Sequence, residues 1–144
     1  MDTTKQPGIL FDDVILKELV FSRKEGYSEK PVWNIHLDSK ASISPDKDQL
    51  VYEMTCEVMD DSNFFNVKCV TIGIFSVIKG KENIGLREFA KTNAATLIFP
   101  YVRETISSIT TKAGIPPVVI PPVYLHLLNR NTVTTISKKE TIEP

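Results

Sequence analysis

Two proline pairs near the C-terminus constrain this chain more than any other feature. Pro116-Pro117 and Pro121-Pro122 lie in the stretch IPPVVIPPV, residues 115–123. Four residues without a backbone N–H cannot continue a helix, and they cannot lie in a central strand. The stretch is therefore expected to be an extended, stiff crossover between other elements, which gives up little conformational entropy when it becomes ordered.

A helix is expected directly before this crossover. Val102, Ile106 and Ile109 follow the i, i+4, i+7 spacing of one helical face, in a helix that should start near Pro100 and stop before Gly114. Many of its residues are β-branched, which lowers helix propensity. This helix therefore needs packing partners, and its small polar positions would let another backbone, such as that of a neighbouring subunit, approach closely.

Four segments before the helix carry the patterns typical of β-strands. They are residues 14–23, 32–43, 50–59 and 64–78. Short turns between alternating segments predict an antiparallel β-meander with one solvated face. The alternation is clearest in the third segment, where one face holds Leu50, Tyr52, Met54, Cys56 and Val58.

Length and composition predict one folded α+β domain over residues 1–144. The chain is 42% hydrophobic and 24% charged, which is ordinary for a folded protein of this size. Residues 1–12 and 132–144 are expected to be flexible tails. A second, shorter helix is expected in VYLHLLNRNTVT, directly after the prolines.

Charge, hydropathy and cysteine content exclude several classes of protein. A formal net charge of −1 gives no field that would attract nucleic acid. No segment approaches the roughly 20 apolar residues of a membrane span, and the N-terminal stretch is interrupted by acids, unlike a secretory signal. Two cysteines, Cys56 and Cys69, are too few for a disulfide scaffold and fit a reducing cytoplasm.

No arrangement of residues predicts catalysis or a cofactor. No C-x-x-C, H-x-x-E-H or clustered acid set supplies the three or four ligands that a metal ion needs. Ser107, in the expected helix, lacks the G-x-S-x-G turn that exposes the nucleophilic serine of many hydrolases. We therefore expect neither an enzyme nor a bound cofactor.

One stretch resembles a known family in its residues and in their spacing. IFPYVRETISSI (98–109), followed by Gly114 and by the prolines of the crossover, is similar to the signature of the SecB family of protein-export chaperones. GIFS (73–76) is similar to the end of that family's fourth strand. Trp33 also falls where the family's second strand carries tryptophan.

The resemblance spans roughly residues 14–128 and implies a fold and an assembly. The fold would be a four-stranded antiparallel sheet with one long and one shorter helix on one face. The assembly would be a homotetramer, built as a dimer of dimers. The surface through which dimers pair would comprise Val67, Cys69, Thr71, Val102, Ile106 and Ile109.

The resemblance also implies a function. The family binds unfolded, non-native polypeptides in long apolar grooves without ATP, and it passes export clients to the SecA translocase motor. A sheet with one or two helices cannot cover both of its faces, so an apolar groove that stays open beside the proline crossover would suit an extended polypeptide. Five aromatic residues are candidates for this groove, although core packing is the simpler explanation for each: Phe21, Trp33, Phe65, Tyr101 and Tyr124.

Departures from the family pattern concern the acidic patch that docks the motor. Glu18 keeps one acid of this patch, but Ser22 and Lys68 stand where acids are expected, and Asn66 replaces an apolar contact. Holding a client is therefore better supported than delivering it to SecA. Two alternatives stay open: a chaperone dedicated to one partner, such as the antitoxin of a toxin–antitoxin system, and a non-chaperone assembly protein with the same fold.

Overall fold

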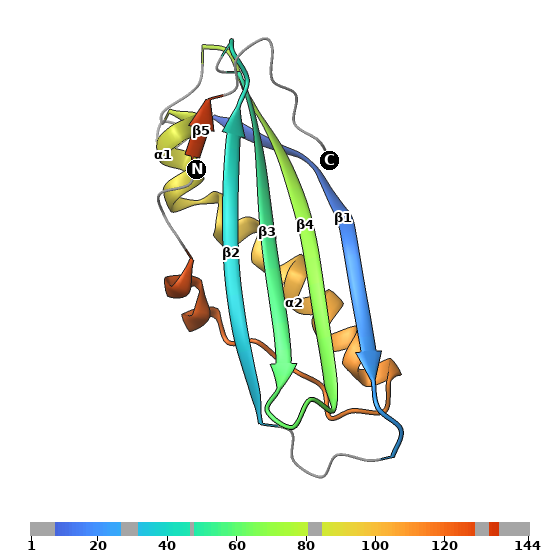
Figure 1. The fold of residues 1–144 in the computed structure, drawn as a ribbon. Coiled ribbons are helices and arrows are strands. Elements are labelled where there is room, and N and C mark those ends of the chain that lie inside the picture. Colours follow the sequence, from blue (N-terminus) through green and yellow to red (C-terminus); the bar gives the residue numbers. More distant parts are fainter. Residues whose placement is uncertain (1–7, 27–31, 47, 81–84, 129–132, 136–144) are drawn as a thin grey trace, which may run out of the picture.

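The computed structural model describes residues 8–26, 32–46, 48–80, 85–128 and 133–135, which form one open sheet with helices on one of its faces (Figure 1). The elements, in chain order, are the strands β1 (Ile9–Arg23), β2 (Trp33–Ile43), β3 (Gln49–Asp60) and β4 (Phe65–Val77), the helices α1 (Leu86–Thr92) and α2 (Ala94–Lys112), the 3-10 helix η2 (Pro122–Leu127) and the strand β5 (Val133–Thr135).

The strand order is β1-β4-β3-β2-β5, and all pairs are antiparallel except β2 with β5. The four antiparallel strands are therefore confirmed, but the meander holds only for β2, β3 and β4. β2 follows β1 in the chain but lies three positions away from it in the sheet, beyond β4 and β3. Three strand spacings are only about 14 Å, so the connection between residues 23 and 33 is long enough for this crossing.

The inner face of the sheet, which α1 and α2 cover, holds the core of the protein (Figure 1). The predicted alternation in β3 is confirmed, since its apolar face is buried and its other face is half-buried or exposed. Helix α1 packs here through Phe89, whose ring lies edge-on to Phe75 with 5.1 Å between centroids.

Helix α2 approaches the sheet most closely over Gly73 of β4. A Cβ atom added at Gly73 would lie 2.5 Å from Cδ1 and 2.8 Å from Cγ1 of Ile98, which is fully buried. Real Cβ contacts are not this short, so the absence of a side chain lets α2 lie at its observed depth.

Helix α2 begins earlier than predicted. It starts at Ala94, so Pro100 lies inside the helix and not in its first turn. Proline removes the N–H that would bond the carbonyl of Thr96, and it destabilises a helix interior by about 3 kcal/mol. Burial of Ile98, Phe99 and other residues of the same face against the sheet offsets this cost, which sequence periodicity alone could not show.

The C-terminal end of α2 is as predicted. Lys112 is the last helical residue, and Gly114 has a positive φ of 74°, a conformation that glycine adopts without strain. The guanidinium of Arg23, at the end of β1, donates hydrogen bonds to the carbonyls of Ala113 and Gly26. It also lies 4.9 Å from the centroid of the Phe64 ring, so one side chain ties the end of β1 to the end of α2.

The crossover, residues 115–121, is held against α2 by one buried hydroxyl. Thr110 is fully buried, and its Oγ1 accepts a hydrogen bond of 3.1 Å from the N–H of Val118. The same hydroxyl donates to the carbonyl of Ile106 at 2.8 Å. The prolines leave the crossover with few N–H donors, and this hydrogen bond satisfies one of them.

We expect Thr110→Val to destabilise the protein by about 1–3 kcal/mol, because the buried N–H of Val118 would lose its acceptor while the packing volume stays the same. Chemical denaturation of the two proteins measures this difference. Thr110→Ser, which keeps the hydroxyl, is the matched control and should keep the N–H paired. A loss in Thr110→Ser with none in Thr110→Val would show that the methyl group, and not the hydrogen bond, is the stabilising contact.

Parts of both ranges expected to be tails lie in strands. Strand β1 already begins at Ile9, and Val133–Thr135 pair with Ala41–Ile43 as the parallel strand β5. The shorter helix is confirmed in position, but it is the six-residue 3-10 helix η2 that ends at Leu127. The remaining tail residues, 1–7 and 136–144, lie outside the described part of the chain.

The turn between β3 and β4 is organised by Asp60, whose side chain is only 3% exposed at the tip of the hairpin. Its Oδ2 accepts hydrogen bonds from the hydroxyl of Ser62 and, at 3.1 Å, from the N–H of Phe64. These bonds, with that of Ser62 the largest contribution, hold the pKa of Asp60 below its ordinary value of 3.8. Asn63 completes the turn with a positive φ of 58°.

A carboxylate with a lowered pKa stabilises the folded state above its unfolded-state pKa, and this contribution is lost as the pH falls towards the folded-state value. We therefore expect the wild-type protein to lose more free energy of unfolding than Asp60→Asn when the pH falls from 5 to below 3.8. At neutral pH the variant should be less stable by about 1 kcal/mol. Urea titrations across this range give both quantities; parallel pH profiles would contradict the assignment.

Candidate functional site

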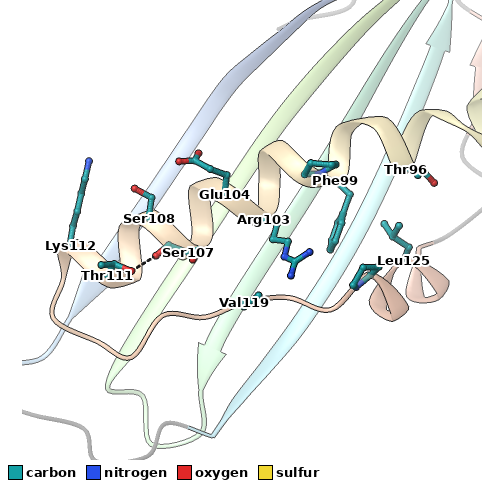
Figure 2. Close-up of a pocket in the computed structure, with 12 residues that line it drawn as sticks. Thr96, Phe99, Arg103, Glu104, Ser107, Ser108, Thr111, Lys112, Val119 and Leu125 are labelled. Carbon is teal, nitrogen blue, oxygen red and sulfur yellow. Dashed lines mark hydrogen bonds between the residues drawn. The ribbon is translucent and has the colours of Figure 1, made fainter.

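A groove of about 760 Å³ lies between α2 and the crossover (Figure 2). One wall is the outer side of α2, from Thr96 to Lys112. The other wall consists of Val119 in the crossover and of Pro122 and Leu125 at the start of η2. The groove exists because the prolines keep the crossover extended alongside the helix.

The lining of this groove combines apolar and polar chemistry. Phe99 contributes a buried ring, and hydroxyl groups follow along α2, where Oγ1 of Thr111 donates to the carbonyl of Ser107 at 2.8 Å. Arg103 and Glu104 line the groove from neighbouring positions of the helix; in Figure 2 Arg103 points towards the crossover, whereas Glu104 points to the other side of α2. The groove thus offers apolar contacts together with one charge of each sign near its middle.

A second surface lies along the outer edge of β2. Residues 33–40 of β2 pair with β3 on one side, and among the described residues only Ala41–Ile43 have a strand, β5, on the other. Helix η2 lies alongside β2 (Figure 1). Trp33 and Ile35 are only half-buried on the inner face, so this end of the sheet offers free backbone groups next to apolar side chains.

The structure does not bring the five candidate client-binding residues together. Trp33 and Tyr124 belong to β2 and η2 and are half-buried. Phe21 is half-buried in β1, and Tyr101 is 46% exposed on α2, where its ring meets Phe11 of β1 edge-on at 6.0 Å. Phe65 is 2% exposed, because its position in β4 faces inward, so it is a core residue and not part of a groove.

Most of the residues expected at the dimer–dimer interface are buried within the single chain, and their role in an assembly stays a prediction. They form the contact between α2 and its own sheet, because the apolar face of the helix found its partner within the chain. Ile109 is half-buried, and the fully buried members of the set are Val67, Cys69, Thr71, Val102 and Ile106.

Strand β1 is the other edge of the sheet, and α2 leaves it partly uncovered. Among the described residues no strand lies beyond it. On its inner face, Leu16 is 49% and Leu19 is 37% exposed. A long edge with exposed leucines is a surface that folded proteins normally cover or protect.

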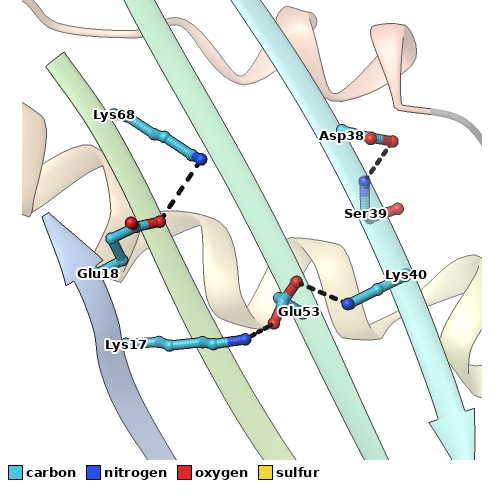
Figure 3. A network of polar contacts seen from close by, with 7 residues as sticks. All are labelled: Lys17, Glu18, Asp38, Ser39, Lys40, Glu53 and Lys68. Carbon is cyan, nitrogen blue, oxygen red and sulfur yellow. Dashed lines mark hydrogen bonds and ion pairs between the residues drawn. The ribbon is translucent and has the colours of Figure 1, made fainter. Parts of the chain in front are cut away.

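The outer face of the sheet carries a network of ion pairs (Figure 3). Glu18, the acid kept from the family's docking patch, lies 3.5 Å from the Nζ of Lys68. Glu53 is held between Lys17 at 3.0 Å and Lys40 at 3.4 Å. Solvated pairs of this kind add little stability, but they neutralise the acids that face the solvent.

The two cysteines face each other across β3 and β4 as buried thiols. Burial raises the pKa of Cys56 to about 12, and it also raises the pKa of Cys69. Both are therefore unreactive packing residues. In the part of the chain that the structure describes, no three histidine, cysteine or acidic residues lie together as a metal site would require.

Comparisons with known proteins identify the family. Residues 3–135 match the sequence profile described as preprotein translocase subunit SecB. The chain belongs to the SecB family. Members of this family are chaperones and not enzymes, which confirms the expectation that the chain is no enzyme.

Curated relatives agree with this assignment over most of their length. The protein-export protein SecB of Orientia tsutsugamushi, strain Boryong, is 26% identical over 153 aligned positions, which cover 100% of this chain and 95% of the relative. The SecB of Methylobacillus flagellatus is 29% identical, covering 86% of this chain and 83% of the relative. An uncharacterized protein of Methanocaldococcus jannaschii is 30% identical, with 85% and 83% covered.

A solved structure shows the same fold. The SecB-like chaperone of Mycobacterium tuberculosis, in complex with a ChAD peptide from the HigA1 antitoxin, superposes with a TM-score of 0.66 at 14% identity. The alignment covers 78% of this SecB-family chain and 86% of the solved chain. Among the described residues, no helix is long and apolar enough to span a membrane.

An apolar groove beside the proline crossover was expected from the sequence, but the five aromatic residues named for it are not among the residues that line it. Its apolar lining comes from Phe99, Val119 and Leu125, which lie in three different elements. One signal could have pointed to it: between the proline pairs, Val118 and Ile120 alternate with Val119, so one of the three had to face away from the helix.

Proposed function

We propose that this SecB-family protein is an ATP-independent holdase, which binds unfolded or non-native polypeptides and keeps them from aggregating. Family membership supports the general activity. The observation on which the site depends is the free edge of β2, residues 33–40, beside half-buried aromatic side chains. An extended client strand can add to such an edge through main-chain hydrogen bonds, which depend little on its sequence.

Trp33 and Tyr124 are the residues that we propose to contact the client's side chains there. Both are half-buried, so each presents part of its ring while the rest is held by the core. Phe21 of β1 and Tyr101 of α2 lie near the opposite edge of the sheet. They would form a second client surface if the client wraps around the protein. Individual contacts of about 1–3 kcal/mol would add up along one long client.

The edge of β1 supports self-assembly, and we propose a homotetramer. Pairing of β1 with β1 of a second copy would continue the sheet and cover Leu16 and Leu19. A dimer formed in this way needs a second self-complementary surface to become a dimer of dimers. The client would then meet several β2 edges on one particle.

Docking to the SecA motor is the family property that the residues of this chain support least. Glu18 is the residue that would contact the motor, but its partner Lys68 neutralises it within the same protomer. This pairing favours the second candidate function, a chaperone dedicated to one partner. The SecB-like chaperone of Mycobacterium tuberculosis, solved in complex with a peptide from an antitoxin, is an example of a chaperone bound to such a partner. An export chaperone meets its clients before they leave the cytoplasm, so we propose that the protein acts there.

The experiment is an aggregation assay with a chemically unfolded substrate protein, with the oligomer's mass measured on the same sample by light scattering. We expect suppression of aggregation at about one tetramer per substrate, without ATP and unchanged when ATP is added. Full aggregation in the presence of an assembled, folded protein would contradict the holdase and favour a non-chaperone assembly protein. To separate a generalist from a dedicated chaperone, three unrelated substrates should be compared.

A further inference from the structure

A pocket of about 230 Å³ lies at the end of the sheet where β1 ends and the turn between β3 and β4 leads into β4 (Figure 1). Ser22 pairs with Asn66 across β1 and β4, and the N–H of Lys24 donates to the carbonyl of Phe64 at 2.8 Å, so both sides of the pocket are held together. Its polar lining consists of two cations and three uncharged side chains: Arg23, Lys24, Ser22, Asn63 and Asn66. In the described part of the chain no acidic residue lines this pocket, so its lining is positively charged.

Most of these polar groups have no partner within the protomer. Among the described residues, the side chains of Ser22, Asn63 and Asn66 make no hydrogen bond, and Lys24 makes no ion pair. The lysines of the outer-face network, in contrast, are each paired with a glutamate (Figure 3). The pocket therefore presents an ammonium group, two amides and a hydroxyl to a ligand.

The second cation of the pocket, Arg23, is fixed in place. Its guanidinium donates hydrogen bonds to the carbonyls of Ala113 and Gly26, and its Nε donates to the carbonyl of Lys24 at 2.9 Å. All three acceptors are uncharged, so no acid among the described residues neutralises this guanidinium. Arg23 therefore supplies a positive charge that is already ordered before any ligand binds.

A carboxylate is the protein group that matches this lining. It accepts hydrogen bonds from ammonium, amide and hydroxyl donors, and hydrogen bonds to a charged acceptor are about twice as strong as those between neutral groups. A cation would be repelled by Arg23 and Lys24. An apolar side chain would leave the donors without acceptors.

Exposed apolar side chains beside the pocket favour a polypeptide over a small free acid. Val20 is 50% and Met59 is 45% exposed. Val20 lies two residues before Ser22 on the same face of β1, and Met59 pairs with Asn66 across β3 and β4. A peptide with one acid in the pocket could cover both apolar side chains with its neighbouring residues, whereas a small acid could not.

We propose that this pocket binds an acidic side chain of a partner polypeptide, whose neighbouring apolar residues contact Val20 and Met59. The pocket lies between β1 and β4, whereas the proposed client edge is β2, on the other side of β3. Partner binding and client binding can therefore fail separately. Ser22 and Asn66 are also positions at which the sequence departs from the family's acidic docking patch, so this partner carries the opposite charge from one that fits that patch.

A labelled peptide in two forms tests the requirement for an acid. The probe is a fluorescent ten-residue peptide in which glutamate alternates with valine, and its twin carries glutamine in place of glutamate. We expect the full-length protein to bind the glutamate form at least ten-fold more tightly in fluorescence anisotropy, and added salt to weaken this binding. Equal affinity for the two forms, or no binding of either, would overturn the proposal.

Two substitutions test the location of the site. Lys24→Glu and Asn66→Asp each make the lining more negative, and each should weaken binding of the glutamate peptide at least ten-fold. Lys79→Glu is the matched control, because it reverses an exposed charge in the turn after β4, at the other end of that strand, and should leave the affinity unchanged. Circular dichroism shows whether each variant is folded. Wild-type affinity in both pocket variants would overturn the proposal.

Two further measurements exclude other sites and other ligands. A loss of peptide affinity in Trp33→Ala, with none in Lys24→Glu, would show that the peptide binds as a client along β2. Displacement of the peptide by an equal concentration of glutarate would assign the pocket to a small free acid. Either result would overturn the acidic partner, and the first would leave client binding intact.

Discussion

Replacing Gly73 with alanine should destabilise the protein by about 1–3 kcal/mol, and valine should be worse. The added Cβ would lie 2.5 Å from Cδ1 of Ile98, so the buried Ile98 side chain must leave its present conformation, or α2 and β4 must move apart. Urea denaturation gives the free energy of unfolding.

A double-mutant cycle separates this contact from any other effect of the substitution. Ile98→Ala alone removes the clashing atoms and leaves a cavity, which should cost about 2–5 kcal/mol. Gly73→Ala should cost much less in the Ile98→Ala background than in the wild type, since the new methyl group then fills vacated space. Strictly additive costs would contradict the contact as the cause. Gly85→Ala, where an added Cβ meets nothing within 4 Å, is the surface control.

Removing the two aromatic rings on the β2 side should weaken client binding about 100-fold. Trp33→Ala and Tyr124→Ala each remove a contact worth roughly 1–3 kcal/mol, and 1.4 kcal/mol corresponds to a ten-fold change in the dissociation constant. The dissociation constant for a fluorescently labelled unfolded substrate, measured by anisotropy, checks the expected change for each single variant and for the pair.

Tyr101→Ala is the matched control for this experiment. It removes an exposed ring of the same kind from the β1 side, and it should change the affinity by less than about three-fold if one β2 edge dominates binding. A loss as large as that of Trp33→Ala would move the main client surface to β1. Thermal unfolding of every variant must stay above the assay temperature, because Trp33 and Tyr124 also contact the core.

The sheet could be predicted because alternation reports directly on burial. Leu50 to Val58 alternate in the sequence, and every second residue is buried in the structure. The end of α2 was also predictable, since Gly114 and the prolines act locally through backbone sterics. The order of the strands was not, because β1 pairs with β4 through contacts far apart in the sequence, which no local pattern encodes.

The candidate site was harder to predict than the fold, because apolar residues of the core and of a groove look alike in a sequence. Phe65 and Trp33 both follow strand alternation, yet one is in the core and the other lies at an uncovered end of the sheet. Val102 and Ile106 form a helical stripe that turned out to face their own sheet.

Amide hydrogen exchange of the client complex tests the central claim most directly. Backbone amides of residues 33–40 of β2 that point away from β3 should exchange at least ten-fold more slowly when an unfolded client is bound, because the client's carbonyl groups accept their hydrogen bonds. Amides of β3 should change little. If the client is held but residues 33–40 keep the exchange rates of the free protein, the client does not lie along this edge and the account is contradicted.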